Sequence, residues 1–489
     1  MMKIPYADAL NMIKSVEPVY AVRSCPVEKA VGRVLAEPVY AKYSVPISPV
    51  SAMDGFAVSA KQTAAASEDY PVTLTDFDRV NTGNVVRDCY DAVIMTEDVE
   101  FSGSENATEI TIHAPISAGR NVRAEGEDIE AGRMILPAGA RIRAFDVGAL
   151  AGYGICEVSV YSISVGIIPT GSELVEPGEI PRAGEVVESN SIMTEAYLRQ
   201  FGVEVIRYPP VADNQALIRS AIAKAVLENE IVLLSAGSSI GSRDFTAQAI
   251  ADLGEVLFHG VLMKPAKPSM LGIVQGKPVI GMPGFPLAAQ TAERLFVRAL
   301  LEEWGWDGPK QEMLLAEAGD DMKSDMDIDE FRFAATAKVD GRVVVLPQIR
   351  SASMQMNSIR ANGYIHIPRG KGGVKAGEAV TAILNVPVEE LSSTVLLAGV
   401  YSAGLERIAA SAAAAGLSVR FGDVSSENPN LLKNKACHAL CVTEAFDVEA
   451  LAGISLELYP LGDDTILLMR SDMQDTITNK IRIFAGGVK

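Results

Sequence analysis

The chain has 489 residues, of which 48% are hydrophobic and 21% are charged, and its formal net charge is −19. A chain of this length is expected to form three or more domains, each with its own core. The acidic balance excludes a general binder of nucleic-acid backbones, because such proteins need a basic surface.

The N-terminus carries no long apolar core of the kind that marks a signal peptide, so we expect a cytoplasmic protein. The Ala-rich run after Val395 is interrupted by Glu406 and Arg407, so no membrane partner is expected. Five scattered cysteines do not form a disulfide framework, which fits a reducing compartment.

The first 160 residues are predicted to be mostly β structure after one short amphipathic helix near Tyr6. Short apolar runs alternate with Gly and Pro turns from about residue 34 to 160, and GRVLAEPVYA resembles GRMILPAGARI. SPVSAMDGFAV places Asp54 in a turn between two short apolar strands. Because Asp-Gly turns are common, this turn alone favours a structural role.

Residues 162–305 alternate predicted strands with predicted helices. The strands are SISVGIIPTG, VEVIRYPPV, IVLLSAGSS and KPVIGMPG, and the helices are SNSIMTEAYLRQFG, NQALIRSAIAKAVLEN, RDFTAQAIADLG and PLAAQTAERLFVRALLEEWG. This rhythm predicts a mostly parallel sheet with helices on both faces.

Residues 309–390 return to a β pattern. FRFAATAKV and RVVVLP are separated by Asp340-Gly341, a hairpin signal, and we expect a small β-barrel or sandwich. Residues 391–489 begin with a strand–helix–strand pattern and have about half the length of a two-lobed small-molecule binding domain. Cys437, His438 and Cys441 resemble metal ligands, but buried strand cysteines are the favoured interpretation because no second ligand cluster follows.

Three loops leave strands of the 162–305 region at the edge where ligands bind in open α/β sheets. They contain Thr170 and Glu173, the Gly/Ser run from Ser235 to Asp244, and the turn from Gly281 to Pro286. The Gly/Ser run would offer backbone N–H groups to a phosphate just before a helix, although a tight turn explains it equally. Glu173 is either a solvated loop residue or a ligand of Mg²⁺ bridging to phosphate, together with Asp244.

Two lysines in VLMKPAKPSMLG, Lys264 and Lys267, each precede a proline. Proline disfavours the α region for the preceding residue, so we expect a polyproline II segment. At a rise of roughly 3 Å per residue the two side chains would point the same way, about 9 Å apart, as a stiff cationic clamp for an anion.

Six motifs, SxMDGxAV, NxRxxGED, PTGSEL, GSSxGxRDxT, KPxKP and MPGxP, occur in this order and together resemble the MoeA family of molybdopterin molybdenumtransferases, which includes the gephyrin E domain. The resemblance covers roughly residues 1–390. It implies a multidomain α/β and β fold, with a MogA-like α/β three-layer domain and a C-terminal β-barrel. The implied divisions are an elongated N-terminal domain (1–46 with 138–161), a β-rich lid (47–137), the α/β domain (162–308) and the barrel (309–390). Residues 391–489 lie outside the usual family length and look like part of a periplasmic-binding-protein-like domain, which predicts a partial α/β extension.

The resemblance implies a homodimer, with the lid of one subunit facing the α/β domain of the other, that inserts molybdate into adenylylated molybdopterin and releases AMP with Mg²⁺. The implied catalytic residues are Asp54, Asp128, Glu173, Asp244, Lys264 and Lys267, with Glu173 and Asp244 as Mg²⁺ ligands. The implied substrate-binding residues are Thr82, Arg123, Thr170, Gly171, Gly237, Ser238, Ser239, Gly241, Ser269, Pro283, Gly284 and Pro286.

Three positions depart from the family pattern. SAGSSIG replaces an SGGVSVG-like loop, Phe285 replaces the asparagine of an LPGNP-like turn, and NTGN replaces MTGA. A tungstate-preferring transferase, a regulatory or non-catalytic paralogue that binds molybdopterin or an oxyanion, and an unrelated nucleotide-binding protein are the alternatives. The extension either binds a ligand or serves dimer contacts.

Overall fold

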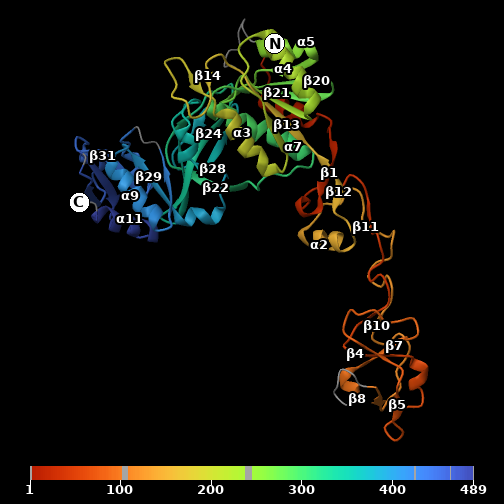
Figure 1. The fold of residues 1–489 in the computed structure, drawn as a ribbon. Helices are drawn as coiled ribbons and strands as arrows, with labels where there is room; N and C mark the ends of the chain where they lie inside the picture. The colour runs from red at the N-terminus through yellow and green to blue at the C-terminus, as the bar shows by residue number, and fades with distance from the viewer. Residues whose placement is uncertain (1–2, 102–107, 237–244, 423–425, 463, 488–489) are drawn as a thin grey trace. The chain divides into compact units, whose positions relative to one another are not determined.

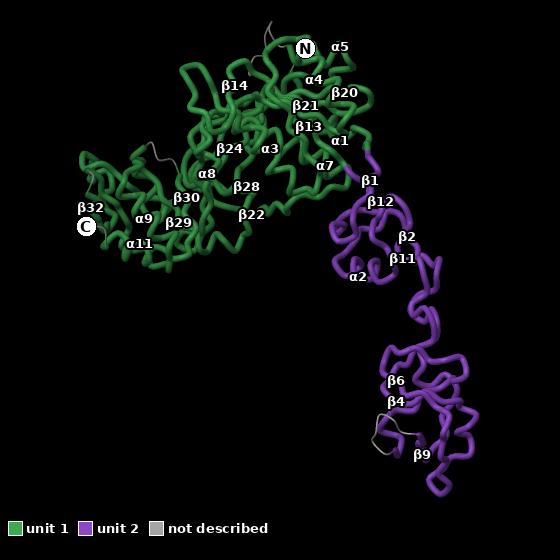
Figure 2. The backbone as a smooth tube through the Cα atoms, viewed as in Figure 1, with its two compact units in different colours: residues 1–19, 163–489 green, residues 20–162 purple. Residues whose placement is uncertain are grey.

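The computed structural model describes residues 3–101, 108–236, 245–422, 426–462 and 464–487. The chain divides into two compact units, here called unit 1 (residues 1–19 and 163–489) and unit 2 (residues 20–162), coloured separately in Figure 2. No helix within the described ranges has both the length and the apolar character needed to cross a membrane.

Unit 2 begins and ends with paired strands. β1 (Ala21–Pro26) pairs antiparallel with β12 (Glu157–Ser162), and β2 (Val39–Tyr40) pairs with β11 (Met134–Leu136). The two segments that resemble each other in sequence are therefore partners in the fold. Helix α2 (Ala144–Gly152) packs on this part through the buried residue Leu150.

Residues 47–137 of unit 2 form short antiparallel strands around one aromatic cluster. The strands are β3 (Val50–Ser51), β4 (Gly55–Val58), β5 (Val72–Leu74), β6 (Asp78–Val80), β7 (Ala92–Met95), β8 (Val99–Glu100), β9 (Ile110–Ile112) and β10 (Val122–Arg123). They give the sheets β6-β4-β7, β5-β9-β8 and β3-β10. Phe56 on β4 is almost fully buried, and its ring lies 5.4 Å from that of Phe77 and 5.1 Å from that of Phe101.

The α/β part of unit 1 contains a six-stranded sheet in the order β16-β13-β17-β21-β20-β18. Its strands are β13 (Ser164–Pro169), β16 (Glu204–Arg207), β17 (Ile231–Ala236), β18 (Glu255–His259), β20 (Met270–Val274) and β21 (Lys277–Pro283). The first four strands in spatial order run parallel to one another, as predicted. The last two strands, β20 and β18, were not predicted, and β20 pairs antiparallel with both β21 and β18.

Helices cover both faces of this sheet (Figure 1). They are α3 (Asn190–Leu198), α4 (Gln215–Glu228), α5 (Phe245–Leu253), α6 (Pro286–Ala292) and α7 (Arg298–Glu303), with a π-helical turn, Glu293–Val297, joining the last two. Consecutive strand residues point to opposite faces, so Leu233 packs in the core with α7, while Leu234 packs in the core with α4 and α5. The predicted three-layer arrangement is confirmed.

Residues 1–19 belong to unit 1, whereas residues 20–46 belong to unit 2. Helix α1 (Tyr6–Lys14) buries Ala9 and Ile13 completely in the core that contains α7. Ile4 forms a parallel bridge to Val261, and the indole N–H of Trp304 donates to the Val16 carbonyl at 2.9 Å. The amphipathic stripe of α1 is thus covered by the α/β part.

The predicted barrel is confirmed as a closed ring of five strands. They are β22 (Glu312–Ala318), β24 (Asp329–Val339), β25 (Arg342–Pro347), β26 (Gly363–Ile367) and β28 (Ala379–Leu384), and the β24–β26 pairing closes the ring. The Asp340-Gly341 hairpin forms as predicted, with φ angles of 47° and 81°. A sixth strand, β19 (Met263–Lys264), reaches from the α/β part and pairs in parallel with the start of β24.

The extension, residues 391–489, is a five-stranded sheet in the order β30-β29-β31-β33-β32. Its elements are β29 (Thr394–Gly399), α9 (Ala403–Ala414), β30 (Ser418–Phe421), α10 (Asn430–Lys433), β31 (Ala439–Thr443), β32 (Leu456–Pro460), β33 (Thr465–Arg470) and α11 (Thr476–Gly486). The parallel β29–α9–β30 unit is as predicted. Cys437 and Cys441 are both buried and Cys441 lies on β31.

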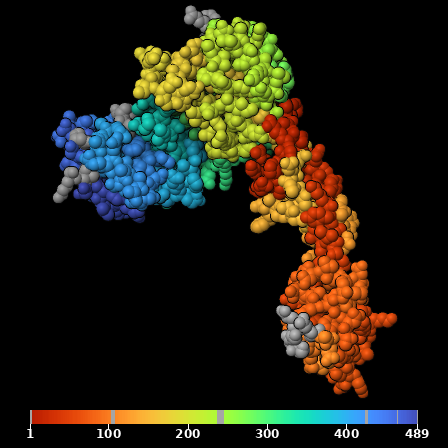
Figure 3. All heavy atoms as spheres, in the orientation of Figure 1, coloured from red at the N-terminus to blue at the C-terminus, as the bar shows by residue number. Residues whose placement is uncertain are grey.

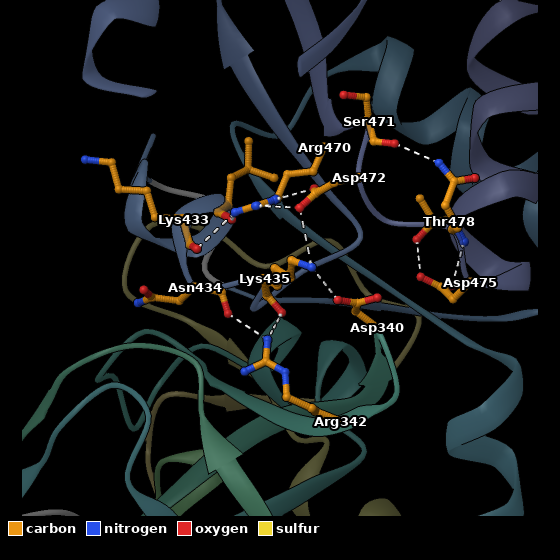
Figure 4. Close-up of polar contacts among 12 residues, drawn as sticks. Asp340, Arg342, Lys433, Asn434, Lys435, Arg470, Ser471, Asp472, Asp475 and Thr478 are labelled. Atoms are coloured by element: carbon orange, nitrogen blue, oxygen red, sulfur yellow. Dashed lines mark hydrogen bonds and ion pairs between the residues drawn. The ribbon is translucent and has the colours of Figure 1, made fainter. Parts of the chain in front are cut away.

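The extension sheet lies between two helices and the barrel (Figure 1), and the space-filling view in Figure 3 shows the extension, in blue, beside the barrel, in teal. Leu397 packs with α9 and α11, whereas Leu396 and Ala398 pack against Ala335 and Ala337 of β24. Charged residues frame this contact in Figure 4. The Lys435 ammonium lies 2.6 Å from the Asp340 carboxylate and 3.5 Å from that of Asp472. Arg342 also donates to the carbonyls of Asn434 and Lys435, and Arg470 donates to the Asp472 carboxylate.

Candidate functional site

Two of the three predicted loops meet at the carboxyl edge of the parallel strands. Pro169 at the end of β13 lies opposite Ser235 on β17, and Ala236 lies opposite Pro283 on β21. The hydroxyl and N–H of Thr170 both donate to the Ser235 carbonyl, so the start of the first loop is fixed to the neighbouring strand.

Most of the second predicted loop, residues 237–244 of the Gly/Ser run, lies outside the described residues. The substrate-binding predictions for Gly237, Ser238, Ser239 and Gly241, and the catalytic and Mg²⁺-ligand prediction for Asp244, fall on it. The described part of this loop, Ser235, lines the cavity described next.

A cavity of about 790 Å³ opens at this edge. Its lining includes the polar residues Thr170, Glu173, Ser189 and Ser235 and the apolar residues Leu174, Val186, Phe285, Met354, Met356 and Ile359. Glu173 is exposed here, and its carboxylate lies over Gly171, where an added Cβ would lie 3.0 Å from both oxygens. The site therefore combines a carboxylate with an apolar wall, as sites for mixed polar and aromatic ligands do.

The MPGFP turn is positioned by its neighbours. Pro286 occupies the first turn of α6, where its fixed φ and missing N–H are tolerated. The Gly284 carbonyl accepts a hydrogen bond from the Asn190 amide at 2.8 Å, and the Leu287 N–H donates to Ala352 at 3.1 Å. Pro283 is buried, while the Phe285 ring is 48% exposed toward the cavity.

The lysine stretch is a closed loop, which corrects the predicted polyproline II clamp. Ala266 has a φ of 71°, a left-handed conformation outside polyproline II, and the Val261 N–H donates to the Lys267 carbonyl at 2.8 Å. Ser269 is fully buried, and its hydroxyl donates to the Ala266 carbonyl at 2.8 Å, so it holds the loop instead of facing a cavity.

The two lysines lie in different surroundings. Lys264 ends β19 and lines a hollow of about 70 Å³, together with Glu330, Arg350 and Ser351 among others. Lys267 lies beside the ammonium of Lys3, which lowers the pKa of Lys3. Both lysines are exposed, so the loop carries cationic groups on an acidic protein.

Arg350 is a cationic residue of this hollow that the sequence patterns did not predict. Its guanidinium contacts Glu330 at 3.0 Å and Asp325 at 3.2 Å, and the Lys264 ammonium lies 3.9 Å from the same Asp325 carboxylate. The segment that contains Arg350 continues into the wall of the larger cavity. The only available signal was a basic residue in a polar loop after β25.

In unit 2, the structure brings Asp54 and Thr82 together. The Asp54 carboxylate accepts hydrogen bonds from the Thr82 N–H at 2.7 Å and from its hydroxyl at 3.0 Å. These two donors hold the pKa of Asp54 below its ordinary value, because they stabilise the charged form. The turn predicted as structural is therefore a turn with an exposed, hydrogen-bonded carboxylate.

Arg123 and Asp128 occupy other positions in unit 2. Arg123 lies on β10 opposite Val50 and forms an ion pair with Glu127 at 2.9 Å. Asp128 accepts a hydrogen bond from the Tyr153 hydroxyl at 3.0 Å, which raises the pKa of that phenol. Asp128 is thus tied to the part of unit 2 that contains α2.

No group of three or more His, Cys, Asp or Glu side chains suited to a metal ion occurs within the described ranges. Among the described residues, Glu173 and Glu188 line the large cavity, and the Glu188 carboxylate already accepts hydrogen bonds from the N–H and hydroxyl of Ser191. One protein carboxylate is compatible with Mg²⁺, which keeps several waters and takes further oxygens from phosphates, but not with a closed structural metal site.

Comparisons with known proteins cover the chain up to the end of the barrel. Residues 4–154 match the MoeA N-terminal region (domains I and II), residues 166–303 a probable molybdopterin binding domain, and residues 316–384 the MoeA C-terminal region (domain IV).

Individual relatives agree with these matches. A Methanocaldococcus jannaschii molybdopterin biosynthesis protein is 31% identical over 74% of this chain and 92% of its own length. A molybdopterin molybdenumtransferase of Haemophilus influenzae is 28% identical over 72% of this chain and 91% of its own. The crystal structure of a molybdopterin biosynthesis MoeA protein from Pyrococcus horikosii is similar with a TM-score of 0.59, at 30% identity, over 79% of this chain and all of the other.

Proposed function

The chain belongs to the MoeA family, and on that premise we propose that it is a molybdopterin molybdenumtransferase of molybdenum cofactor biosynthesis. We propose that it inserts molybdate into adenylylated molybdopterin and releases AMP, assisted by Mg²⁺. The observation that carries this proposal is the large cavity at the carboxyl edge of β13, β17 and β21, with the lysine loop and its small hollow in the same unit.

The chemistry of the two hollows supports the proposal. The large cavity offers an apolar wall for a planar heterocycle and polar groups, Thr170 and Ser235, for its edges. The small hollow has a cationic lining from Lys264 and Arg350, which suits a tetrahedral dianion such as molybdate. Segment 348–360 contributes to both hollows, so their occupants would be neighbours.

The residues of this chain would hold and orient the reactants. Glu173 would place carboxylate oxygens next to the pyrophosphate bridge, where Mg²⁺ neutralises the repulsion between carboxylate and phosphate. Lys264 would approach the anion as a point charge, at present balanced in part by Asp325. An arriving dianion therefore competes with this carboxylate for the ammonium group.

We further propose that the active form is a homodimer, and that Asp54 and Asp128 act as carboxylates of the same reaction. Asp54 is held ionised by Thr82, so it is suited to bind a metal ion or to position a water molecule rather than to donate a proton. Sedimentation of the purified protein measures the subunit number directly, and a monomer with full activity would contradict the dimer.

The test uses purified protein with adenylylated molybdopterin, molybdate and Mg²⁺, and it measures AMP release by chromatography. We expect AMP release to depend on molybdate. In Lys264→Ala the rate of AMP release should fall at least tenfold, because a positive charge aimed at the transferred group is lost. Lys224→Ala, which removes an exposed lysine from α4, is the matched control. Tight binding without AMP release would favour a non-catalytic paralogue, and faster release with tungstate would change the metal assigned.

A further inference from the structure

The segment that follows β25 forms a wall of both hollows. Arg350 and Ser351 line the small one, while Ser353 to Met356 and Ile359 line the large one. Helix α8 (Met356–Arg360) ends the segment and points Met356 and Ile359, both largely exposed, toward the large cavity. The shape of the site therefore depends on what holds residues 348–360.

The beginning of this segment is held by the extension. Gln348 is buried, and its side-chain amide donates to the Phe421 carbonyl on β30 at 2.6 Å. Its backbone N–H donates to Phe333 on β24 at 2.9 Å. Gln348, which itself lines the small hollow, thus joins the barrel to the extension.

The end of this segment is also held by the extension. The Arg360 guanidinium lies 5.3 Å from the centre of the Tyr401 ring, within the range of a cation–π interaction. The Nε of Arg360 is buried without a hydrogen-bond partner among the described residues, and the Tyr401 ring lies against its guanidinium.

Tyr401 itself is anchored within the extension. Its ring packs edge-on against Phe421 at 5.9 Å, and burial, followed by the neighbouring Glu406 at the start of α9, raises the pKa of its hydroxyl. Phe421 therefore supports both ends of the segment: its carbonyl accepts the hydrogen bond from Gln348, and its ring packs against Tyr401, which contacts Arg360.

We propose that the extension, which lies outside the three family matches, is a positioning module for the substrate site, acting on segment 348–360 through Gln348 and Tyr401. Tyr401 is a positioning residue and not a catalytic one, because it lines neither hollow. The effect on catalysis rests on the proposed function, whereas the physical coupling between the extension and the wall does not.

The experiment compares Tyr401→Ala, Tyr401→Phe and Tyr459→Ala in the full chain. Tyr401→Phe keeps the ring over Arg360, and Tyr459→Ala removes a tyrosine from β32 of the same extension. The first readout is hydrogen exchange of the amides from 349 to 361, and the second is the KM and kcat of AMP release. Thermal unfolding identifies any variant in which the extension has lost its fold.

We expect Tyr401→Ala to speed amide exchange in 349–361 and to raise KM by about two- to fivefold, the size of an exposed cation–π contact, with kcat within about twofold. Tyr401→Phe and Tyr459→Ala should match the wild type in both readouts. Unchanged exchange in Tyr401→Ala, or an equal change in Tyr459→Ala, would overturn the proposal. Altered exchange with no AMP release in any variant would keep the coupling and refute the proposed reaction instead.

Discussion

Replacing Glu293 by glutamine is expected to remove a pH dependence from the stability of unit 1. Glu293 is buried in the π-helical turn between α6 and α7, where its carboxylate accepts a hydrogen bond from the Thr194 hydroxyl on α3. Burial raises its pKa to about 7, because the charged form loses its hydration, and the Thr194 hydroxyl and Arg294 offset only part of this loss.

The sign and size of the effect follow from the two pKa values. The ordinary value is 4.5 and the folded value is about 7, so between these pH values the folded state binds a proton that the unfolded state has lost. The stabilisation that the protonated Glu293 gives to the folded state is therefore complete below pH 4.5, the ordinary pKa, and is lost as pH rises through the folded pKa of about 7. At about 1.4 kcal/mol per pKa unit, the free energy of unfolding falls by about 3 kcal/mol across the window.

The two tryptophans of the chain, Trp304 and Trp306, both lie in unit 1, so their fluorescence follows the urea unfolding of that unit. In Glu293→Gln the amide oxygen still accepts from Thr194, but the titrating group is gone. Between about pH 5 and about pH 8, the free energy of unfolding of the variant should rise by about 2–3 kcal/mol relative to that of the wild type. Glu302→Gln on α7 controls for the loss of one negative charge, and parallel wild-type and Glu293→Gln profiles would refute the reasoning.

Three further changes test individual contacts. Thr82→Val removes one donor to Asp54, so the pKa of Asp54, followed by carbon NMR, should move toward its ordinary value, whereas Thr82→Ser should leave it in place. Phe285→Asn should weaken pterin binding, measured by calorimetry, by about two- to tenfold if the ring packs on the heterocycle, and an unchanged affinity would remove Phe285 from the wall. Gly341→Ala forces a side chain into a left-handed turn at φ 81°, so urea unfolding should show a loss of about 1–2 kcal/mol, and a neutral result would show that the turn relaxes.

The α/β part was predictable because its signals are local. Strands such as IVLLS are apolar on both faces, and the helices between them carry caps and terminal glycines, as at Gly202 with a φ of 73°. The Asp340-Gly341 turn was predictable for the same reason, since two residues that tolerate positive φ lie between two apolar runs. In each case the residues that decide the structure are neighbours in sequence.

The lysine loop was mispredicted because a distant partner decides its shape. Proline after lysine favours extended geometry locally, but Met263 and Lys264 pair with Asp329 and Glu330, which are far along the chain. The left-handed conformation of Ala266 has no local signature, because alanine does not favour it. A strand of two residues formed by such distant pairing, as β19 is, is invisible to period-based patterns.

The candidate site was half predictable. Thr170, Glu173 and Ser235 follow from the rule that ligands collect at the carboxyl edge of a parallel sheet. The opposite wall, with Met354 and Ile359, comes from the barrel more than a hundred residues later, and a few apolar residues in a polar loop do not reveal what they face. Only the packing of the barrel on the α/β part brings the two sides together.

Strand β24 has a consequence for how this chain can be divided. The first residues of β24 pair with β19 of the α/β part, and its pairing with both β25 and β26 closes the barrel. Three of its residues, Ala335, Ala337 and Val339, are covered by the extension. A chain shortened to end at residue 385 would expose this apolar face to water, and exposed faces of this kind drive aggregation. Solubility, rather than substrate chemistry, would then limit any such fragment, and protease digestion of the folded protein should leave residues 163–489 as one resistant piece.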